Sequence, residues 1–139
     1  MTQEEKELLL KDLCARLPYE VIVGTTDNDG SLPNFWTLDS YKCLNEDVII
    51  TNCEYNADRL TYFCDVRPYL FPLSSMTEEQ KKEFIFLHSD KQKEAGHSNL
   101  EIIIEPCKLK IDWLNKNHFD YRGLIPMDLA IDATGLNIY

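Results

Sequence analysis

The residues with the most chemical potential in this sequence lie in one short segment, HFDYRG at 118–123. It places an imidazole (His118), a carboxylate (Asp120), a phenol (Tyr121) and a guanidinium (Arg122) within the reach of one helical turn. A guanidinium offers a planar, two-pronged donor to phosphate or carboxylate oxygens, and an imidazole adds a donor that titrates near neutral pH. The segment is therefore a candidate binding site for a small anion, such as a phosphorylated metabolite or a nucleotide signal, with Arg122 as its main charge.

The same segment also fits a purely structural helix ending, which is the interpretation we favour. His118 would then counter the helix dipole, and Phe119 would pack against the core. Asp120 would pair with Arg122, and Gly123 would take a left-handed backbone. This interpretation predicts that acceptors within the protein hold the Arg122 guanidinium.

The motif DNDG at 27–30 resembles the middle of a calcium-binding loop. Such a loop needs an acid at its first position and a glutamate at its twelfth. Counting from Gly30 as the sixth position puts Thr25 first and Trp36 twelfth, and neither side chain fits. The motif therefore predicts a hairpin turn.

The cysteines favour a structural role. Their number is odd and no pair has the CxxC spacing of a metal or redox site, so we expect free thiols that behave as small buried apolar residues. The sequence also contains no nucleophile elbow, P-loop or glycine-rich dinucleotide turn. We therefore expect no metal, no cofactor and no enzymatic activity. The five cysteines are Cys14, Cys43, Cys53, Cys64 and Cys107.

Aromatic residues in the predicted β region form the candidate surface for binding another protein. Between Tyr19 and Arg67 only three residues are basic, which disfavours base stacking on a nucleic acid. The net charge of −10 repels nucleic acids and membrane surfaces and favours a protein with a basic surface. The charge also has the plainer role of keeping the protein soluble. The candidate partner-binding residues are Phe35, Trp36, Tyr41 and Tyr55.

The beginning of the chain predicts a helix over residues 3–17. Thr2 followed by Glu5 is a capping-box pattern, and Pro18 ends the helix. Charged residues of this helix, Arg16 among them, are expected on the solvent face. The apolar residues of this helix recur at helical spacing: Leu8, Leu9, Leu13 and Leu17. Of these, Leu9 and Leu13 are expected to face the core.

The period changes to that of strands over residues 19–66, where apolar runs alternate with tight turns and no helical pattern intervenes. Strands on such short connections pair antiparallel. We therefore predict an α+β fold with a small twisted antiparallel sheet, flanked by the N-terminal helix and by C-terminal helices. The size of this β region favours closure into an SH3-like barrel.

The second half of the chain continues with alternating elements. Residues 67–75 predict an extended connector, because Pro68 and Pro72 remove ladder donors. The predicted elements that follow are a helix over 77–88, a strand over 100–105 that stops at Pro106, a helix over 107–118 and an irregular tail over 119–139.

Length and composition place these elements in one domain, 1–139, because 139 residues is close to the usual domain size. No apolar run approaches the roughly 18 residues of a membrane span. The N-terminus MTQEEKELLLK carries acids where a signal peptide carries Lys or Arg. We therefore expect a cytoplasmic protein.

Three stretches resemble a group of small proteins without an assigned activity that gut Bacteroides-type bacteria encode, often on prophages and other mobile elements. They are LLLKDLCARLPY (8–19), RPYLFPLSSMTEEQKKE (67–83) and NHFDYRGLIPMDLAIDATGLNIY (117–139). The resemblance implies a small accessory protein of mobile elements and carries no catalytic residue or cofactor.

Two functional hypotheses lead, ahead of a third, an enzyme of unrecognised type. The first is a non-enzymatic accessory protein that binds a host macromolecule, as an acidic inhibitor or modulator. The alternative is a small-ligand binder, or sponge, that uses His118, Tyr121 and Arg122.

Overall fold

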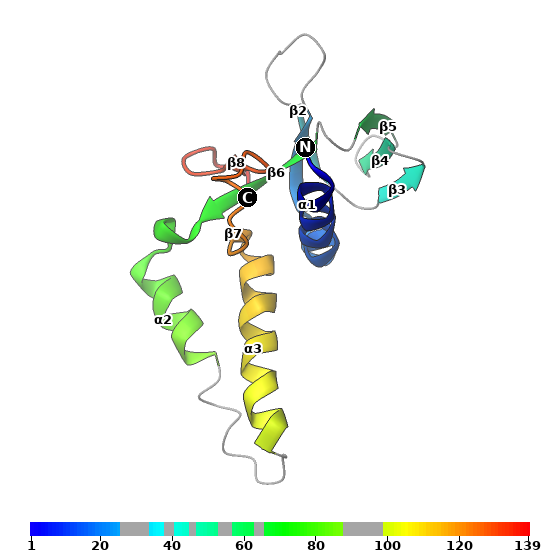
Figure 1. Ribbon diagram of the computed structural model, residues 1–139. Helices are drawn as coiled ribbons and strands as arrows, with labels where there is room; N and C mark the ends of the chain where they lie inside the picture. The colour runs from blue at the N-terminus through cyan, green and yellow to red at the C-terminus, as the bar shows by residue number, and fades with distance from the viewer. Residues whose placement is uncertain (26–33, 38–40, 45–46, 53–56, 63–65, 88–98) are drawn as a thin grey trace.

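The computed structural model describes residues 1–25, 34–37, 41–44, 47–52, 57–62, 66–87 and 99–139. For the described residues within 25–62 and 99–105, it describes the backbone but not the side chains. Three helices and two sheets make up this part of the chain, which confirms the predicted α+β class. In Figure 1, α2 and α3 lie side by side, and α1 lies beside the strands. The predicted turn at 27–30 lies outside the described residues.

The first helix, α1 (Gln3–Arg16), begins as its sequence predicts. The Thr2 hydroxyl accepts the Glu5 backbone N–H, and the Glu5 carboxylate accepts the Thr2 N–H, so two otherwise unpaired donors of the first turn are satisfied. A 3₁₀ turn, η1 (Leu17–Tyr19), follows, since Pro18 cannot continue the helix. Leu9 and Leu13 are buried, as predicted.

The central strand is β6 (Val66–Pro72), and this corrects the predicted connector over 67–75. It pairs antiparallel with β1 (Ile22–Thr25), and β1 pairs antiparallel with β2 (Asn34–Thr37). On the other half of β6, two short strands pair in parallel: β7 (Phe119–Asp120) and β8 (Ile131–Asp132). The sheet is therefore mixed rather than wholly antiparallel, with five strands.

The two prolines of β6 are tolerated because of the edge toward which they face. Backbone groups of a strand point alternately to its two edges. The Phe71 N–H bonds to His118 on one edge, while the Leu70 carbonyl accepts the Ala133 N–H on the other. Pro68 and Pro72 lie two residues before and two residues after Leu70, so their ring nitrogens face the same edge as the Leu70 carbonyl. On that edge β8 pairs with residues 69 and 70 of β6. Neither proline removes a donor that this pairing uses.

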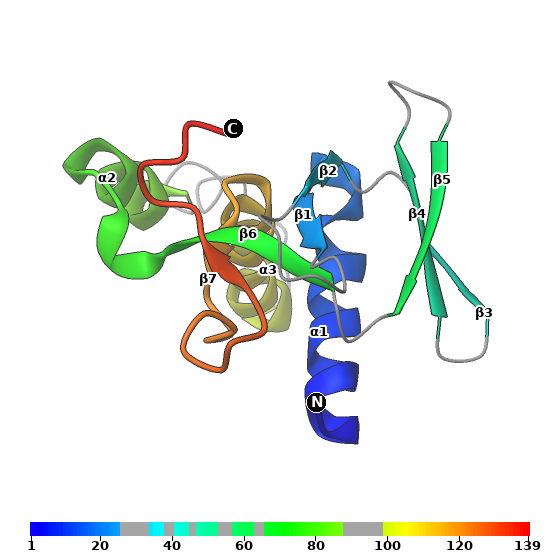
Figure 2. The ribbon, with the colours of Figure 1, turned by 90° about the horizontal axis from the view of Figure 1, so that it is seen from above.

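A second sheet of three strands contains β3 (Tyr41–Leu44), β4 (Asp47–Asn52) and β5 (Ala57–Tyr62), all antiparallel. Figure 1 and Figure 2 place this sheet beyond α1, on the side away from α2. The described strands thus form two open sheets, and the predicted closure into an SH3-like barrel is wrong.

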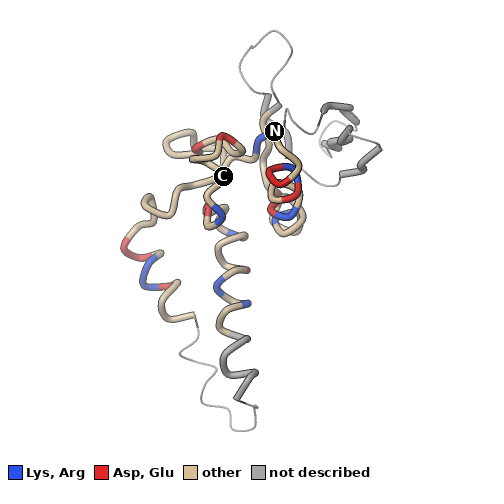
Figure 3. Tube along the Cα trace, viewed as in Figure 1, with Lys and Arg blue, Asp and Glu red and all other residues tan. Residues whose placement is uncertain are grey.

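The remaining helices are α2 (Glu78–Phe86) and α3 (Asn99–Lys116). The Thr77 hydroxyl caps α2, and Glu78 and Glu79 lie in its first turn, where the helix dipole favours acids (Figure 3). The predicted strand over 100–105 is wrong, because α3 runs through it and past Pro106. β-Propensity is weak beside tertiary packing, and the second half of this helix buries Trp113 and Leu114. No helix in the described part of the chain is long and apolar enough to cross a membrane.

The tail over 119–139 is only partly irregular, since it supplies β7 and β8. It also closes the core around β6. Val66 packs with residues of α1 and β1, Leu70 packs with the turn at 124–130, and Phe71 packs against Trp113 and Phe119. One strand therefore touches all three apolar clusters of the described residues.

Replacement of Leu13 by alanine should lower the free energy of unfolding by about 2–5 kcal/mol, because the side chain is 2% exposed and leaves a cavity in the cluster of α1 and β1. Urea denaturation measures the loss. The matched control is Ile111→Ala on α3, where the side chain is 46% exposed and the loss should be much smaller. Equal losses in the two variants would show that α1 does not pack as described.

Candidate functional site

The inward face of α1 carries charge as well as leucine. Leu9, Asp12, Leu13 and Arg16 are its buried residues, spaced as one face of a helix. The prediction that Arg16 faces solvent is therefore wrong: the side chains of Arg16 and Asp12 are both 0% exposed. Charged side chains almost never reach such burial unless they are paired.

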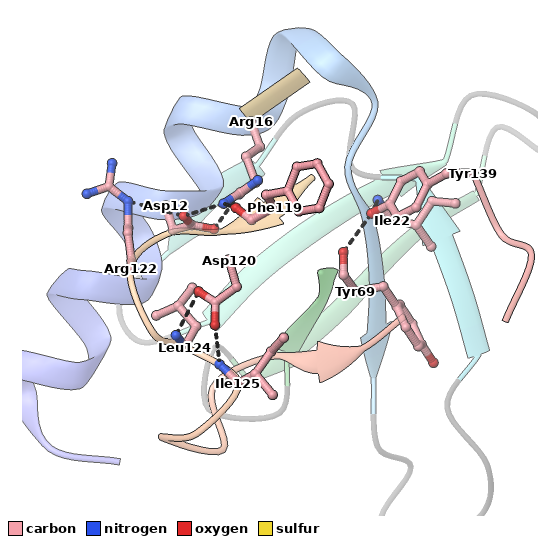
Figure 4. A network of polar contacts seen from close by, with 10 residues as sticks. All are labelled: Asp12, Arg16, Ile22, Tyr69, Phe119, Asp120, Arg122, Leu124, Ile125 and Tyr139. Carbon is pink, nitrogen blue, oxygen red and sulfur yellow. Dashed lines mark hydrogen bonds and ion pairs between the residues drawn. The ribbon is translucent and has the colours of Figure 1, made fainter. Parts of the chain in front are cut away.

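The Asp12 carboxylate is the centre of this polar cluster. Arg16 Nε donates to Asp12 Oδ2 at 2.7 Å, and Arg16 Nη2 donates to Asp12 Oδ1 at 3.1 Å. Arg16 Nη2 also donates to the Phe119 carbonyl at 2.8 Å, and Arg122 Nε donates to Asp12 Oδ1 at 3.1 Å. Figure 4 shows the carboxylate held between the two guanidiniums. The contacts join α1 to the segment that follows α3.

Arg122 therefore has a partner within the protein, but not the one predicted from the sequence. Its side chain is 18% exposed and pairs with Asp12, 110 residues away. The predicted pair between Asp120 and Arg122 is wrong. Asp120 Oδ1 accepts the Leu124 N–H and Asp120 Oδ2 accepts the Ile125 N–H, both at 2.9 Å, so this buried carboxylate holds the following turn.

Tyr121 lies between the two arginines. The Cζ atoms of Arg122 and Arg16 lie 4.7 Å and 5.6 Å from the centre of its ring. Guanidiniums at this distance from an aromatic ring are attracted by its electron-rich face. The Tyr121 hydroxyl is buried and has no hydrogen-bond partner among the described residues.

His118 is the residue at which the chain turns out of α3. It takes a left-handed backbone with φ of 56°, a position usually given to glycine, while Gly123 takes φ of 75° as predicted. Its ring stacks on Tyr139, with centroids 3.8 Å apart and planes 12° apart. Burial, together with the nearby Arg16 charge, lowers the pKa of His118 to about 4. The imidazole is neutral at pH 7, so the prediction that it counters the helix dipole is wrong.

Tyr139 is a member of the cluster that sequence reasoning missed. Its hydroxyl accepts the Ile22 N–H at 3.1 Å and donates to the Tyr69 carbonyl at 2.8 Å. Burial raises the pKa of this phenol, which therefore stays protonated at neutral pH. No pattern in the sequence points to Tyr139, because its partners lie 70 and 117 residues away.

Three of the four predicted partner-binding aromatics lie in described strands of the two sheets. Phe35 and Trp36 belong to β2, in register with Gly24 and Val23, and Tyr41 belongs to β3 of the second sheet. Tyr55 lies outside the described residues. The structure thus places the three described residues in two neighbouring sheets rather than in one.

Two of the five cysteines are placed with their side chains, and both are exposed: Cys14 on α1 and Cys107 on α3. The prediction that the cysteines are buried apolar residues is wrong for these two. Within the described ranges, no three His, Cys, Asp or Glu side chains gather as metal ligands.

Comparison with protein-family models finds no family that matches the chain, and comparisons with curated proteins and with solved structures find no match either.

Replacement of Asp12 by asparagine should lower the free energy of unfolding by about 3–5 kcal/mol, because it leaves the buried Arg16 guanidinium without a counter-charge. Arg122→Ala should cost less, about 1 kcal/mol, since that guanidinium is partly solvated. Urea denaturation at pH 7 ranks the variants. The control is Glu78→Gln, which breaks the exposed pair with Lys81 and should change little. A loss for Asp12→Asn no larger than that of the control would contradict the burial of the pair.

The low pKa of His118 predicts that stability falls with acidification. The unfolded chain takes a proton near the ordinary value of 6.5, whereas the folded chain takes it only near 4. The stabilisation is therefore complete above pH 6.5 and is lost as the pH falls toward 4. Between pH 7 and pH 5 the His118 contribution should fall by about 2 kcal/mol. Urea midpoints at several pH values measure the slope.

The comparison variant is His118→Asn, because asparagine accepts a left-handed backbone but does not titrate. Its free energy of unfolding should change less between pH 7 and pH 5 than that of the wild type. An identical pH slope in the two proteins would mean that His118 does not titrate as described.

Proposed function

We propose that this chain is a non-enzymatic, cytoplasmic accessory protein of a phage or other mobile element, and that it modulates a host protein by binding a basic surface on it. The observation that carries the proposal is the position of the acidic charge. Between residues 26 and 65 there are eight acidic and two basic residues, a surplus of six negative charges out of the chain's ten. Such a field favours encounter with a basic partner.

The described strands of this acidic stretch lie together. They are β2 at the edge of the first sheet and β3 to β5, which form a sheet of their own beyond α1 (Figure 2). Phe35, Trp36 and Tyr41 belong to these same strands. Aromatic residues are enriched among those that contribute most to protein interfaces. The acids of the described strands are Asp47 of β4 and Asp58 of β5, so aromatic and acidic residues occur in neighbouring strands.

The mobile-element setting rests on the resemblance of residues 8–19, 67–83 and 117–139. The same segments include most of α1 and of β6 and the polar cluster around Asp12, which join the helices to the central strand. The segment 20–66 carries most of the acidic surplus and lies outside that resemblance. The resembling segments would then form a scaffold shared with those proteins, and residues 20–66 would form a binding region specific to this chain.

The small-ligand alternative is less well supported by the contacts. Arg122 is bonded to Asp12, and Asp120 is bonded to two backbone N–H groups. His118 is stacked on Tyr139 and neutral at pH 7, so it adds no charge for an anion. Most of the predicted ligand groups thus already serve the fold.

Neutralising acids in the acidic stretch should weaken capture of basic host proteins. The full chain, immobilised, is exposed to lysate from a gut Bacteroides strain, and captured proteins are quantified by mass spectrometry. Four neutral substitutions should reduce capture by roughly tenfold, as expected for a loss of about 1.4 kcal/mol in binding. Capture by the wild type should also fall as salt is raised. The substitutions are Glu46→Gln, Asp47→Asn, Glu54→Gln and Asp58→Asn.

The matched control makes the same change in net charge at exposed positions of the described surface outside the stretch. It should capture the same proteins as the wild type. Equal loss in both variants would mean that net charge alone matters, and no loss in either would mean that the acidic stretch is not the binding region; both results contradict the proposal. The control substitutions are Glu4→Gln, Glu20→Gln, Glu79→Gln and Glu83→Gln.

A further inference from the structure

The Tyr139 hydroxyl joins β1 to β6 at the end of their ladder of paired residues. The strands pair with Gly24 opposite Arg67 and Val23 opposite Pro68, so the next opposed pair is Ile22 and Tyr69. These two residues are linked through Tyr139 instead. The Ile22 N–H donates to its hydroxyl, which in turn donates to the Tyr69 carbonyl (Figure 4). The phenol therefore extends the ladder by one rung.

Two local bonds hold the start of the segment that carries Tyr139: the Thr134 N–H donates to Asp132 Oδ1, and the Leu136 N–H donates to the Ala133 carbonyl. Residues 134–137 are exposed and Ile138 is half-buried. Gly135 has φ of 80° and Asn137 has φ of 47°, conformations typical of turns rather than of a strand. The Tyr139 ring is held by the His118 stack and by Phe71, whose ring centroid lies 5.8 Å away. Beyond the local bonds, the Tyr139 side chain thus joins this segment to β1, β6 and His118.

We propose that residues 134–139 form a reversible strap, which closes the β1–β6 ladder through the Tyr139 hydroxyl and is released when His118 takes up a proton. In the released state the Ile22 N–H and the Tyr69 carbonyl no longer bond to Tyr139 and are open to water. The strap therefore controls access to the end of this ladder.

The surroundings of the ring pair explain why a proton on His118 favours release. Arg16 of α1 carries the nearest cationic charge, and its counter-ion Asp12 is already held by Arg16 and Arg122. Asp120 is two residues away, but both its oxygens are bonded to backbone N–H groups. The Tyr69 phenol of β6 is neutral at these pH values.

A proton on His118 would not be stabilised by a hydrogen bond at Nδ1. Its Nδ1 atom is buried and has no hydrogen-bond partner among the described residues. A cation on this ring is therefore buried beside Arg16 while Tyr139 covers it. Departure of the Tyr139 ring exposes the imidazole to water, which favours its charged form.

Amide hydrogen exchange, followed by NMR on the full chain, tests the strap at a single atom. The Ile22 N–H is bonded to Tyr139. The Gly24 N–H is the internal reference, because it faces the same edge of β1 but lies opposite Arg67 of β6. At pH 7, Tyr139→Phe removes only the hydroxyl and should lower the protection factor of Ile22 at least about tenfold relative to Gly24. Unchanged protection of Ile22 in this variant would overturn the proposal.

The second arm tests the proton. In the wild type, the protection factor of Ile22 relative to Gly24 should fall roughly tenfold or more between pH 7 and pH 5, since an imidazole freed from the stack titrates near its ordinary value. His118→Phe keeps an aromatic ring against Tyr139 but cannot take a proton, so its ratio should stay constant. A constant ratio in the wild type, or an equal fall in His118→Phe, would overturn the role of His118.

Discussion

The buried ion pair between Asp12 and Arg16 is the interaction on which the arrangement of the described residues depends. Both side chains are fully buried, and their bonds reach the Phe119 carbonyl and the Arg122 guanidinium more than 100 residues along the chain. Burial of charge is costly unless each partner stays paired, so α1 cannot leave the segment after α3 without exposing or stranding a charge. This constraint also positions β7, which begins at Phe119 and pairs with the central strand β6.

The charged and polar residues fall in two regions of the chain. Around Asp12 the polar groups face inward, where His118 is kept neutral by burial and Tyr139 completes the ladder between β1 and β6. The acidic surplus of the sequence lies instead in residues 26–65, where β3 to β5 form a sheet beyond α1. The segment with the richest chemistry in the sequence therefore serves the fold, and the proposed binding function belongs to a segment without any recognisable motif.

Local patterns predicted what depends on local contacts. The capping residue Thr77 begins α2 because its own turn decides that geometry. Local patterns failed where distant contacts decide the structure. Pro68 lies in a central strand because its ring nitrogen faces an edge where no hydrogen bond to residue 68 is used. Residues 100–105 are helical despite their β-branched residues. Arg16 was assigned to solvent by its charge, although its spacing from the buried leucines already placed it on the inward face. Tyr139 could not be predicted, since its role depends on strands formed far away in sequence.

A double-mutant cycle between Asp12 and Arg122 tests the central claim most directly, because it asks whether the polar residues of the HFDYRG segment bond to α1 or remain available for a ligand. The free energy of unfolding is measured by urea denaturation for the wild type, Asp12→Ala, Arg122→Ala and the double variant. If the pair at 3.1 Å is part of the fold, the two losses are not additive, and the coupling is about 0.5–3 kcal/mol in favour of the native pair. Additive losses, with a coupling near zero, would contradict the account.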